Sequence, residues 1–282
     1  MARGISIHIG LNSVDAARYG GWPGTLNACE FDAHDMKAIA ENMGFTPTMI
    51  LTREATSDRV LGALQSAANE LVAGDTLLIS YSGHGGQIPD LDGDEPDHAD
   101  ETWVLYDRQI LDDELYVAYS KFARGVRIVI FSDSCHSGSV SRDAPPPYLG
   151  FAGLTPLDVG QAAQAALSRA MPPEIAQRDF LHRRDTYLAI ADKNPSVEQD
   201  EIAPCVLLIS GCQDNQTSLD GVHNGLFTAN LLTVWNGGTF KGSYERLHAQ
   251  VVRRMPSSQT PRLGVVGQYD GTFVKADSAF TH

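Results

Sequence analysis

The chain has 282 residues, 43% of them hydrophobic, which is enough for one large α/β domain with a substantial core. Lys and Arg number 21 against 35 Asp and Glu, and the resulting net charge of −14 disfavours nucleic acid as a partner, since phosphate binding needs a basic face. No run of 18 apolar residues exists and no signal-peptide pattern opens the chain, so we expect a cytoplasmic protein without a membrane partner. The acidic excess favours basic peptides, metal cations or simply solubility.

The four cysteines, Cys29, Cys135, Cys205 and Cys212, form no CxxC pair and have no zinc-like spacing. We therefore expect free thiols in a reducing compartment. Cys205 and Cys212 flank the apolar run VLLIS and are expected to be small buried residues rather than ligands.

The first third of the chain alternates strand and helix signals. Residues 4–10 and 46–51 predict strands, whereas helical spacing runs through 29–43 and 57–73 and stops at glycines. The segment 12–25 is rich in Gly, Asn, Tyr and Trp, which predicts a loop.

The next strand, 75–82, ends in Gly83-His84-Gly85-Gly86, which places a histidine between glycines. Residues 90–101 then collect carboxylates that repel one another unless they are solvated or bound to a cation. Glycine is at the wrong position for an EF-hand loop, so calcium would need another geometry.

Residues 102–106 and 109–111 predict a hairpin, and a helix follows from 112 to 122. Asp112 and Asp113 open this helix, where they serve as a cap and dipole partners on the plainest interpretation.

The stretch 127–140 reads RIVIFSDSCHSGSV and organises the chain. Its apolar first half predicts a buried strand, and Cys135 follows at the carboxyl end, where ligands bind in open α/β sheets. A thiolate there can attack a carbonyl, and His84 can accept the thiol proton or pass one to a leaving amine. His136 is the alternative partner, although a neighbouring side chain usually points elsewhere.

A long insert is expected at 141–204. Three successive prolines begin it, residues 161–170 are alanine-rich and predict a helix, and Pro172-Pro173 ends that helix. A strand at 206–210, helices at 225–235 and 244–255, and a strand at 261–268 complete the chain, so βαβ units and a mostly parallel sheet are expected.

The blocks YSGHGG at 81–86 and DSCHSG at 133–138, with DLDGDE at 90–95 between them, resemble the metacaspases and their bacterial relatives. The resemblance implies a caspase-like α/β/α sandwich in a single domain over 1–282, with a mostly parallel central sheet of about six strands. It also implies a cysteine endopeptidase with Cys135 as nucleophile and His84 as acid/base partner. The N–H groups of Cys135 and Gly85 would then bind the oxyanion.

The same resemblance implies cleavage after Arg or Lys, in a pocket made by Asp133, Asp32, Ser82 and Cys29. A carboxylate pair can hold a guanidinium by charge-assisted bonds and repels an acidic side chain. The alternative is a structural role, in which Asp32 and Asp133 only cap the local backbone. Protein or peptide substrates with basic residues are the expected partners, and the chain is expected to be a monomer.

No cofactor is expected to be obligatory, and calcium is expected as an activator. Residues that resemble the calcium ligands of the family are Asp112, Asp113, Asp100 and Asp143. The insert is also expected to be a self-processing segment, because its part 174–193 contains four basic residues that would be cleavage positions: Arg178, Arg183, Arg184 and Lys193.

Two other classes of function compete with an Arg/Lys-specific endopeptidase. One is an inactive caspase-like module that binds partners, and the other is a regulatory protein that binds divalent cations through its acidic segments. Only the enzyme makes the Cys135 thiol indispensable.

Overall fold

The computed structural model describes residues 2–89, 91, 99–135, 168–193, 202–212, 216 and 218–282. Within them, a central sheet of six strands has the order β2-β1-β3-β7-β8-β9. The strands are β1 (Gly4–Gly10), β2 (Thr46–Leu51), β3 (Thr76–Ser82), β7 (Arg127–Asp133), β8 (Cys205–Ser210) and β9 (Arg262–Gly267). Only β9 runs antiparallel to its neighbour, so the predicted mostly parallel sheet is confirmed.

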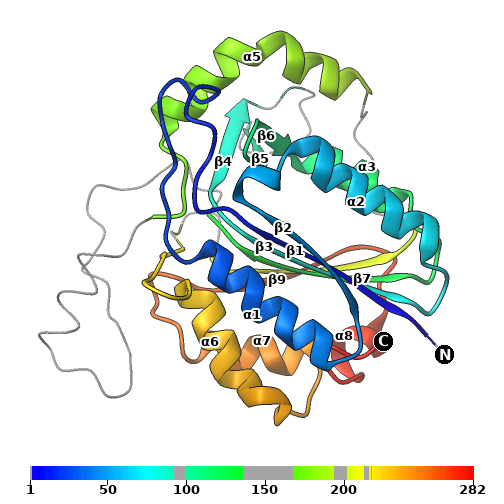
Figure 1. Cartoon of the computed structure of the whole chain (residues 1–282). Helices are drawn as coiled ribbons and strands as arrows, with labels where there is room; N and C mark the ends of the chain where they lie inside the picture. Colours follow the sequence, from blue (N-terminus) through cyan, green and yellow to red (C-terminus); the bar gives the residue numbers. More distant parts are fainter. Residues whose placement is uncertain are drawn as a thin grey trace, which may run out of the picture.

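Helices cover both faces of this sheet (Figure 1). One face carries α2 (Ser57–Glu70) and α3 (Asp112–Ser120), and the other carries α1 (Cys29–Asn42), α6 (Leu226–Trp235), α7 (Tyr244–Val252) and α8 (Gly271–Lys275). Strand β7 shows why two layers form. Ile128 and Ile130 join the core under α2 and α3, whereas Val129 and Phe131 join the core under α1, α6 and α7, because successive side chains point to opposite faces.

A smaller antiparallel sheet contains β4 (Gly85–Pro89), β5 (Ala99–Val104) and β6 (Gln109–Leu111). The pairing of β5 with β6 confirms the predicted hairpin, and β4 was not expected from the sequence. Helix α5 (Pro173–Lys193) packs on β4 (Figure 1), with the ring of Tyr187 buried against Ile88 and Leu111. Two short 3-10 helices, Thr52–Glu54 and Asn236–Gly238, complete the elements.

The helix predicted over 161–170 is wrong at its described end. Residues 161–167 lie outside the described part of the chain, but Ser168 and Ala170 form isolated β-bridges with Leu219 and Gly85. Alanine-rich composition favours a helix only where no stronger tertiary contact competes, and here backbone bonds to two other segments hold the chain extended.

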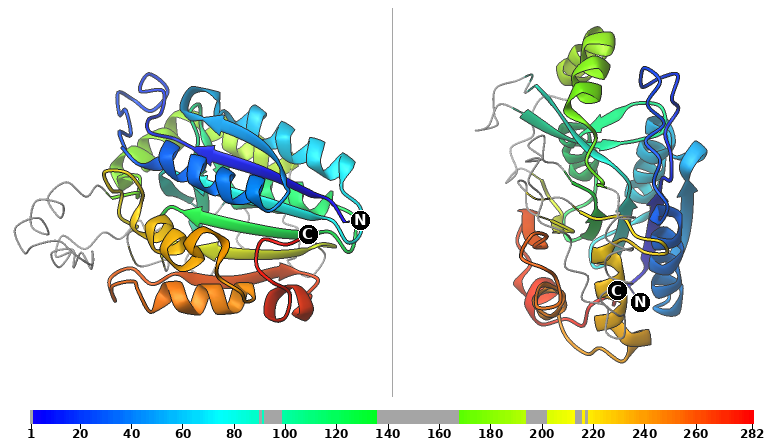
Figure 2. Two further views of the ribbon diagram at one scale, coloured as in Figure 1. Left: turned by 60° about the horizontal axis from the view of Figure 1, so that its bottom comes forward. Right: turned by 90° about the vertical axis from the view of Figure 1, so that its left-hand side faces the viewer.

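The start of α1 is fixed by side chains from outside the helix. Asn12 Oδ1 accepts the N–H groups of Cys29 and Glu30, at 3.0 and 3.2 Å, and the Asp220 carboxylate accepts those of Asn27 and Ala28, at 2.7 and 3.2 Å. These bonds satisfy N–H groups that a helix cannot pair itself. They also hold the first turn of α1 at the carboxyl edge of the sheet, which is the end opposite the two termini (Figure 2, left).

Candidate active site

Cys135 lies two residues beyond β7 and is completely buried. Its Sγ accepts the N–H of Ser218 and lies 3.4 Å from the carbonyl oxygen of the same residue. Cys135 also packs against Ala170 and Cys212. The predicted nucleophile is therefore covered by two segments distant in sequence.

His84 occupies the turn between β3 and β4 and is 6% exposed. Its Nε2 donates to the carbonyl oxygen of Gly24 at 3.2 Å, and the ring of Trp22 covers it at a centroid distance of 4.8 Å. Burial lowers the pKa of His84 to about 4, although the Gly24 carbonyl acts in the opposite direction. The imidazole is therefore neutral near pH 7, and its buried Nδ1, which has no hydrogen-bond partner among the described residues, is left to accept a proton.

Gly85 brings the backbone next to His84 against that of Cys135. A Cβ at Gly85 would lie only 1.9 Å from the Cys135 carbonyl oxygen, so no residue with a side chain fits there. The N–H of Gly85 points into the site and donates to the carbonyl oxygen of Arg169 at 2.9 Å. The alternative partner His136 lies outside the described residues.

The predicted pocket residues come together at the carboxyl edge of the sheet. Ser82 and Asp133 stand side by side because β3 and β7 pair in parallel register. Asp32 approaches from α1 and accepts the Ser82 hydroxyl at 2.7 Å, and Cys29 lies one turn earlier on the same helix. Asp220, which also holds the start of α1, lies close to them. We call the group the acidic pocket; it consists of Asp32, Ser82, Asp133 and Asp220.

The guanidinium of Arg169 fills the acidic pocket. Its Nη2 lies 2.7 Å from Asp32 Oδ2 and 2.9 Å from Asp220 Oδ1, and its Nη1 lies 3.0 Å from Asp133 Oδ2 and 2.8 Å from Ser82 Oγ. A void of about 10 Å³ adjoins the pocket residues and is lined in part by Asp32, Ser82 and Asp133. That space is no larger than one water needs.

Sequence reasoning missed both Arg169 and Asp220. Asp220 lies ten residues beyond the end of β8. An acidic residue shortly after a predicted central strand was the one feature of the sequence that could have indicated it. Arg169 gave no signal, because it lies in a segment whose composition predicted a helix. Gly225 was missed as well: a Cβ there would lie 2.6 Å from the guanidinium carbon of Arg169 and 2.6 Å from Asp133 Oδ2.

Burial dominates the electrostatics of this pocket. It raises the pKa of Asp32 to about 6, with Arg169 acting in the opposite direction. It also raises the pKa of the Cys29 thiol, again opposed by Arg169, so Cys29 stays protonated in this arrangement. Asp32 and Asp133, the two predicted pocket carboxylates, both bind the Arg169 guanidinium. Each also accepts a backbone N–H, Asp32 from Gly225 and Asp133 from Thr228.

Cys205 and Cys212 are buried free thiols, as the sequence predicts. Cys212 has a further relationship that the sequence did not indicate, since it adjoins Cys135. The hydrogen bond between the two thiols and burial both raise the pKa of Cys212, which therefore stays a neutral neighbour of the predicted nucleophile.

The predicted calcium ligands do not gather into a site in the described part of the chain. Asp112 and Asp113 open α3, Asp100 is buried on β5, and Asp143 lies outside the described residues, as do most of 90–95. Among the described residues, no group of three His, Cys, Asp or Glu side chains is arranged to hold a metal ion. The described residues alone therefore do not fit a calcium ion.

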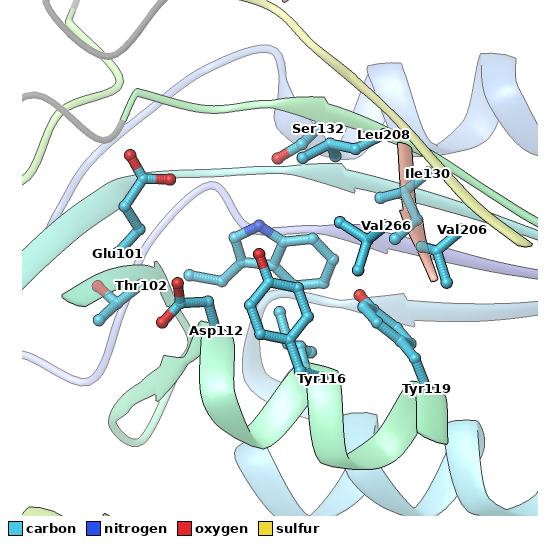
Figure 3. Close-up of a pocket in the computed structure, with 12 residues that line it drawn as sticks. Glu101, Thr102, Asp112, Tyr116, Tyr119, Ile130, Ser132, Val206, Leu208 and Val266 are labelled. Atoms are coloured by element: carbon cyan, nitrogen blue, oxygen red, sulfur yellow. The ribbon is translucent and has the colours of Figure 1, made fainter. Parts of the chain in front are cut away.

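A cavity of about 80 Å³ lies between α3 and the sheet. Figure 3 shows Tyr116 and Tyr119 rising from α3 toward Ile130, Val206 and Val266, with Glu101 and Asp112 at one side. Neither Cys135 nor His84 lines it.

The four basic residues proposed as self-cleavage positions all lie on α5. Arg178 donates to the Gly20 carbonyl at 3.1 Å, and Arg183 donates to the Asp107 carbonyl at 2.7 Å. Neither of these two guanidinium groups enters the acidic pocket.

The sequence of this chain matches a known protein family. The model of the caspase domain, Peptidase C14, matches residues 13–271. The chain belongs to the caspase-domain family. Metacaspase-1 of Kluyveromyces lactis is 32% identical over 231 residues, which are 73% of this chain and 53% of that protein. Metacaspase-1 of Saccharomyces cerevisiae is 32% identical over 234 residues, which are 73% of this chain and 54% of that protein. This caspase-domain chain thus spans about half the length of the curated relatives it matches.

Solved structures agree with the family assignment. A Geobacter sulfurreducens protein of known crystal structure is 46% identical to this chain. The match covers 99% of this chain and 98% of the Geobacter protein, and the two structures superpose with a TM-score of 0.86. The match to Caspase-1 of Spodoptera frugiperda covers 95% of this chain and 88% of that one. Its TM-score is 0.57 at 12% identity, so this likeness shows the fold alone. The metacaspase resemblance and the caspase-like fold are confirmed. No helix in the described ranges is long and apolar enough to span a membrane.

Proposed function

We propose that this caspase-domain chain is a cysteine endopeptidase that cleaves after Arg or Lys, with Cys135 and His84 as its dyad. One observation carries the proposal: the guanidinium of Arg169 is bound by Asp32, Asp133 and Asp220 beside Cys135. Three carboxylates around one cation leave the pocket with a negative surplus, so it favours an Arg or Lys side chain and repels an acidic one.

The contacts of Arg169 indicate how a substrate would bind. Its carbonyl oxygen accepts the N–H of Gly85, which is the donor that would stabilise an oxyanion, with the N–H of Cys135 as the second donor. The Cys135 thiol would pass its proton to neutral His84 and attack the carbonyl carbon, forming a thioester. His84 would return the proton to the leaving amine, and water would release the acid.

The test is hydrolysis of fluorogenic peptides ending in Arg, Lys or Asp, by the wild-type chain and by Cys135→Ala. We expect cleavage after Arg and Lys that disappears in the variant. Cleavage after Asp would contradict the pocket assignment. An inactive binding module, the competing function, would hydrolyse none of the three peptides in any form of the chain.

Activation by calcium remains part of the proposal. Because Asp112 and Asp113 are two of the three described members of the predicted ligand set, Asp112→Asn and Asp113→Asn should weaken any gain in activity or melting temperature produced by millimolar calcium. Asp58→Asn is the matched control, since it removes an acid from the first turn of α2. If calcium changes neither quantity in the wild-type chain, calcium activation is wrong.

The proposed partners are proteins or peptides with exposed basic residues. A monomer in the cytoplasm and a single domain over 1–282 remain predictions.

A further inference from the structure

The 12–25 loop, which connects β1 to α1, holds His84 from outside the turn that carries it. The Gly24 carbonyl oxygen accepts the Nε2–H of His84 at 3.2 Å, and the ring of Trp22 covers the imidazole. The first contact leaves Nδ1 to accept the thiol proton, and the second keeps water away from the ring. Any residue that fixes this loop therefore also fixes the proposed acid/base partner.

Helix α5 contacts the 12–25 loop through two arginines. Nη2 of Arg183 donates to the carbonyl oxygen of Arg18, and Nη1 of Arg178 donates to that of Gly20 at 3.1 Å. The other arm of Arg183, Nη1, donates to the Asp107 carbonyl oxygen at 2.7 Å, between β5 and β6. The planar fork of one guanidinium thus joins the loop to the smaller sheet, which an ammonium group cannot do with the same geometry.

The side chain of Arg183 also begins a stack that ends at His84. Its guanidinium carbon lies 5.3 Å from the centre of the Tyr19 ring, and the rings of Tyr19 and Trp22 meet edge to face at 6.1 Å. The Trp22 ring in turn lies 4.8 Å from the imidazole. Cations over ring faces and edge-to-face ring pairs are both favourable contacts. Four side chains therefore connect the middle of α5 to the proposed acid/base partner.

The backbone of α5 kinks at this same residue. Arg183 has φ −116° and ψ 18°, outside helical geometry, although the helix continues on both sides of it. Kinks usually occur at proline or glycine, but α5 contains no glycine and its one proline, Pro173, is its first residue. The kink therefore coincides with the contacts of one side chain rather than with a helix-breaking residue.

Arg183 also has a structural role that the test has to separate. Its Nη1 lies 3.4 Å from Oδ1 of Asp179, whose side chain is completely buried. The other oxygen of Asp179 accepts the Tyr187 hydroxyl at 2.6 Å and the Gln109 amide at 2.9 Å. Loss of Arg183 would destabilise this buried carboxylate whatever happens at His84. The ion pair by itself, however, predicts no change in the chemistry of His84.

We propose that Arg183 is a positioning residue, which from the kink of α5 fixes the 12–25 loop and through it holds His84 in the orientation that acid/base chemistry needs. The inference rests on the proposed function and deepens it by giving α5 a task in the reaction. The contacts of the Arg183 guanidinium are with the loop, Asp107 and Asp179, and not with the acidic pocket. Its removal should therefore slow proton transfer and leave the binding of an Arg side chain intact.

The first measurement is hydrolysis of an Arg-coumarin peptide by wild type, Arg183→Gln, Arg183→Lys and the matched control Arg184→Gln. Arg184 is exposed beside Arg183 on the same helix, so Arg184→Gln should match wild type. In Arg183→Gln we expect kcat to fall about 10- to 100-fold with KM within about twofold, because a small misplacement of a catalytic group costs about this much. Arg183→Lys keeps a cation over Tyr19 but loses the fork, so its kcat should lie between the two.

The second measurement is the pKa of His84, read from the imidazole NMR signals and assigned with His84→Gln. Burial lowers this pKa to about 4, and the charged groups that act on the ring, Arg169 and Asp220, are retained in every variant. A loosened loop admits water, so the pKa should rise toward 6.5 in Arg183→Gln, and the acid limb of kcat/KM should move to higher pH with it. A purely structural loss would lower the melting temperature and leave this pKa in place.

A double-mutant cycle with Trp22→Ala tests the route. If Arg183 acts through the loop, both substitutions release the same cover over His84. The double variant should then lose little more kcat than Trp22→Ala alone. Losses that multiply in the double variant would overturn the inference, because Arg183 would then act by another route.

The outcomes separate this inference from the proposed function. If wild type hydrolyses Arg peptides and Arg183→Gln keeps the wild-type kcat and acid limb, the inference is overturned and the endopeptidase stands. If Arg183→Gln does not fold, as circular dichroism would show, wild-type kcat and His84 pKa in Arg183→Lys overturn it instead. If wild type hydrolyses no Arg or Lys peptide, the endopeptidase is wrong, and the His84 pKa of the variants still decides whether Arg183 fixes the ring.

Discussion

Oδ1 of Asp220 lies 2.9 Å from Nη2 of Arg169, and both side chains are fully buried. The other oxygen of Asp220 accepts the N–H of Asn27 at 2.7 Å, just before α1 begins. One carboxylate therefore binds the cation in the acidic pocket and also fixes the helix that carries Asp32. This dual contact makes Asp220 a determinant of the pocket that the motifs do not include.

Asp220→Asn should reduce kcat/KM for Arg peptides by about 10- to 100-fold, because a hydrogen bond to a charged group contributes about 1.5–3 kcal/mol. The Asn carbonyl oxygen can still accept a backbone N–H, so α1 should keep its position. Asp277→Asn, which removes the acid paired with Arg127 at 3.0 Å, is the control and should leave the pocket unchanged. Equal losses in both variants would contradict a specific role for Asp220.

Gly225→Ala tests how closely the pocket fits a guanidinium. The new Cβ would lie 2.6 Å from both the Arg169 guanidinium carbon and Asp133 Oδ2, so the side chains have to move. We expect kcat/KM for Arg peptides to fall by about 10- to 100-fold, in line with the usual 1–3 kcal/mol cost of overpacking. Gly264→Ala is the control, because its Cβ would meet nothing within 4 Å. An unchanged Arg preference in Gly225→Ala would show that substrates do not reach this depth.

Trp22 should set the acid limb of the pH profile through His84. The tryptophan covers the imidazole, and burial lowers the pKa of His84 to about 4. Trp22→Ala lets water reach the ring, so the pKa should rise toward 6.5 and the acid limb of kcat/KM should move to higher pH. Trp22→Phe keeps an apolar cover and should shift the limb less. A limb that stays in place in Trp22→Ala would mean that another group controls it.

His8 should make the fold sensitive to acid. It is buried between Ser6 and Ser80, and burial, followed by the nearby Lys37, lowers its pKa to about 3. The unfolded chain takes up the proton first, near pH 6.5. The contribution of neutral His8 to stability is therefore complete above about pH 6.5 and is lost as the pH falls toward about 3.

Urea unfolding at several pH values measures this effect. Between pH 6.5 and 4, the free energy of unfolding of wild type should fall more steeply than that of His8→Gln, by about 1.4 kcal/mol for each pH unit. His34→Gln is the control, because it makes the same substitution at an exposed position of α1. Parallel curves for wild type and His8→Gln would contradict the lowered pKa.

The predicted helix over 161–170 shows where local signals fail. Alanine-rich composition gives helix propensity, but the described end of this segment is extended because Gly85 and Ser218 bind its backbone. Arg169 meets Asp32 from 137 residues away, and no periodicity or motif in the chain encodes that distance. The contact that carries the proposed function was therefore invisible in the sequence.

The sequence alone determined the central strands, the helices between them, and the positions of Cys135 and His84 at strand ends. These features are local, because side-chain periodicity and glycine-containing turns are set by a few neighbouring residues. Only the tertiary structure decided that Asp220 completes the acidic pocket and that Arg169 occupies it. Those contacts join segments far apart in the chain, and they form because a buried guanidinium is stable only where carboxylates surround it.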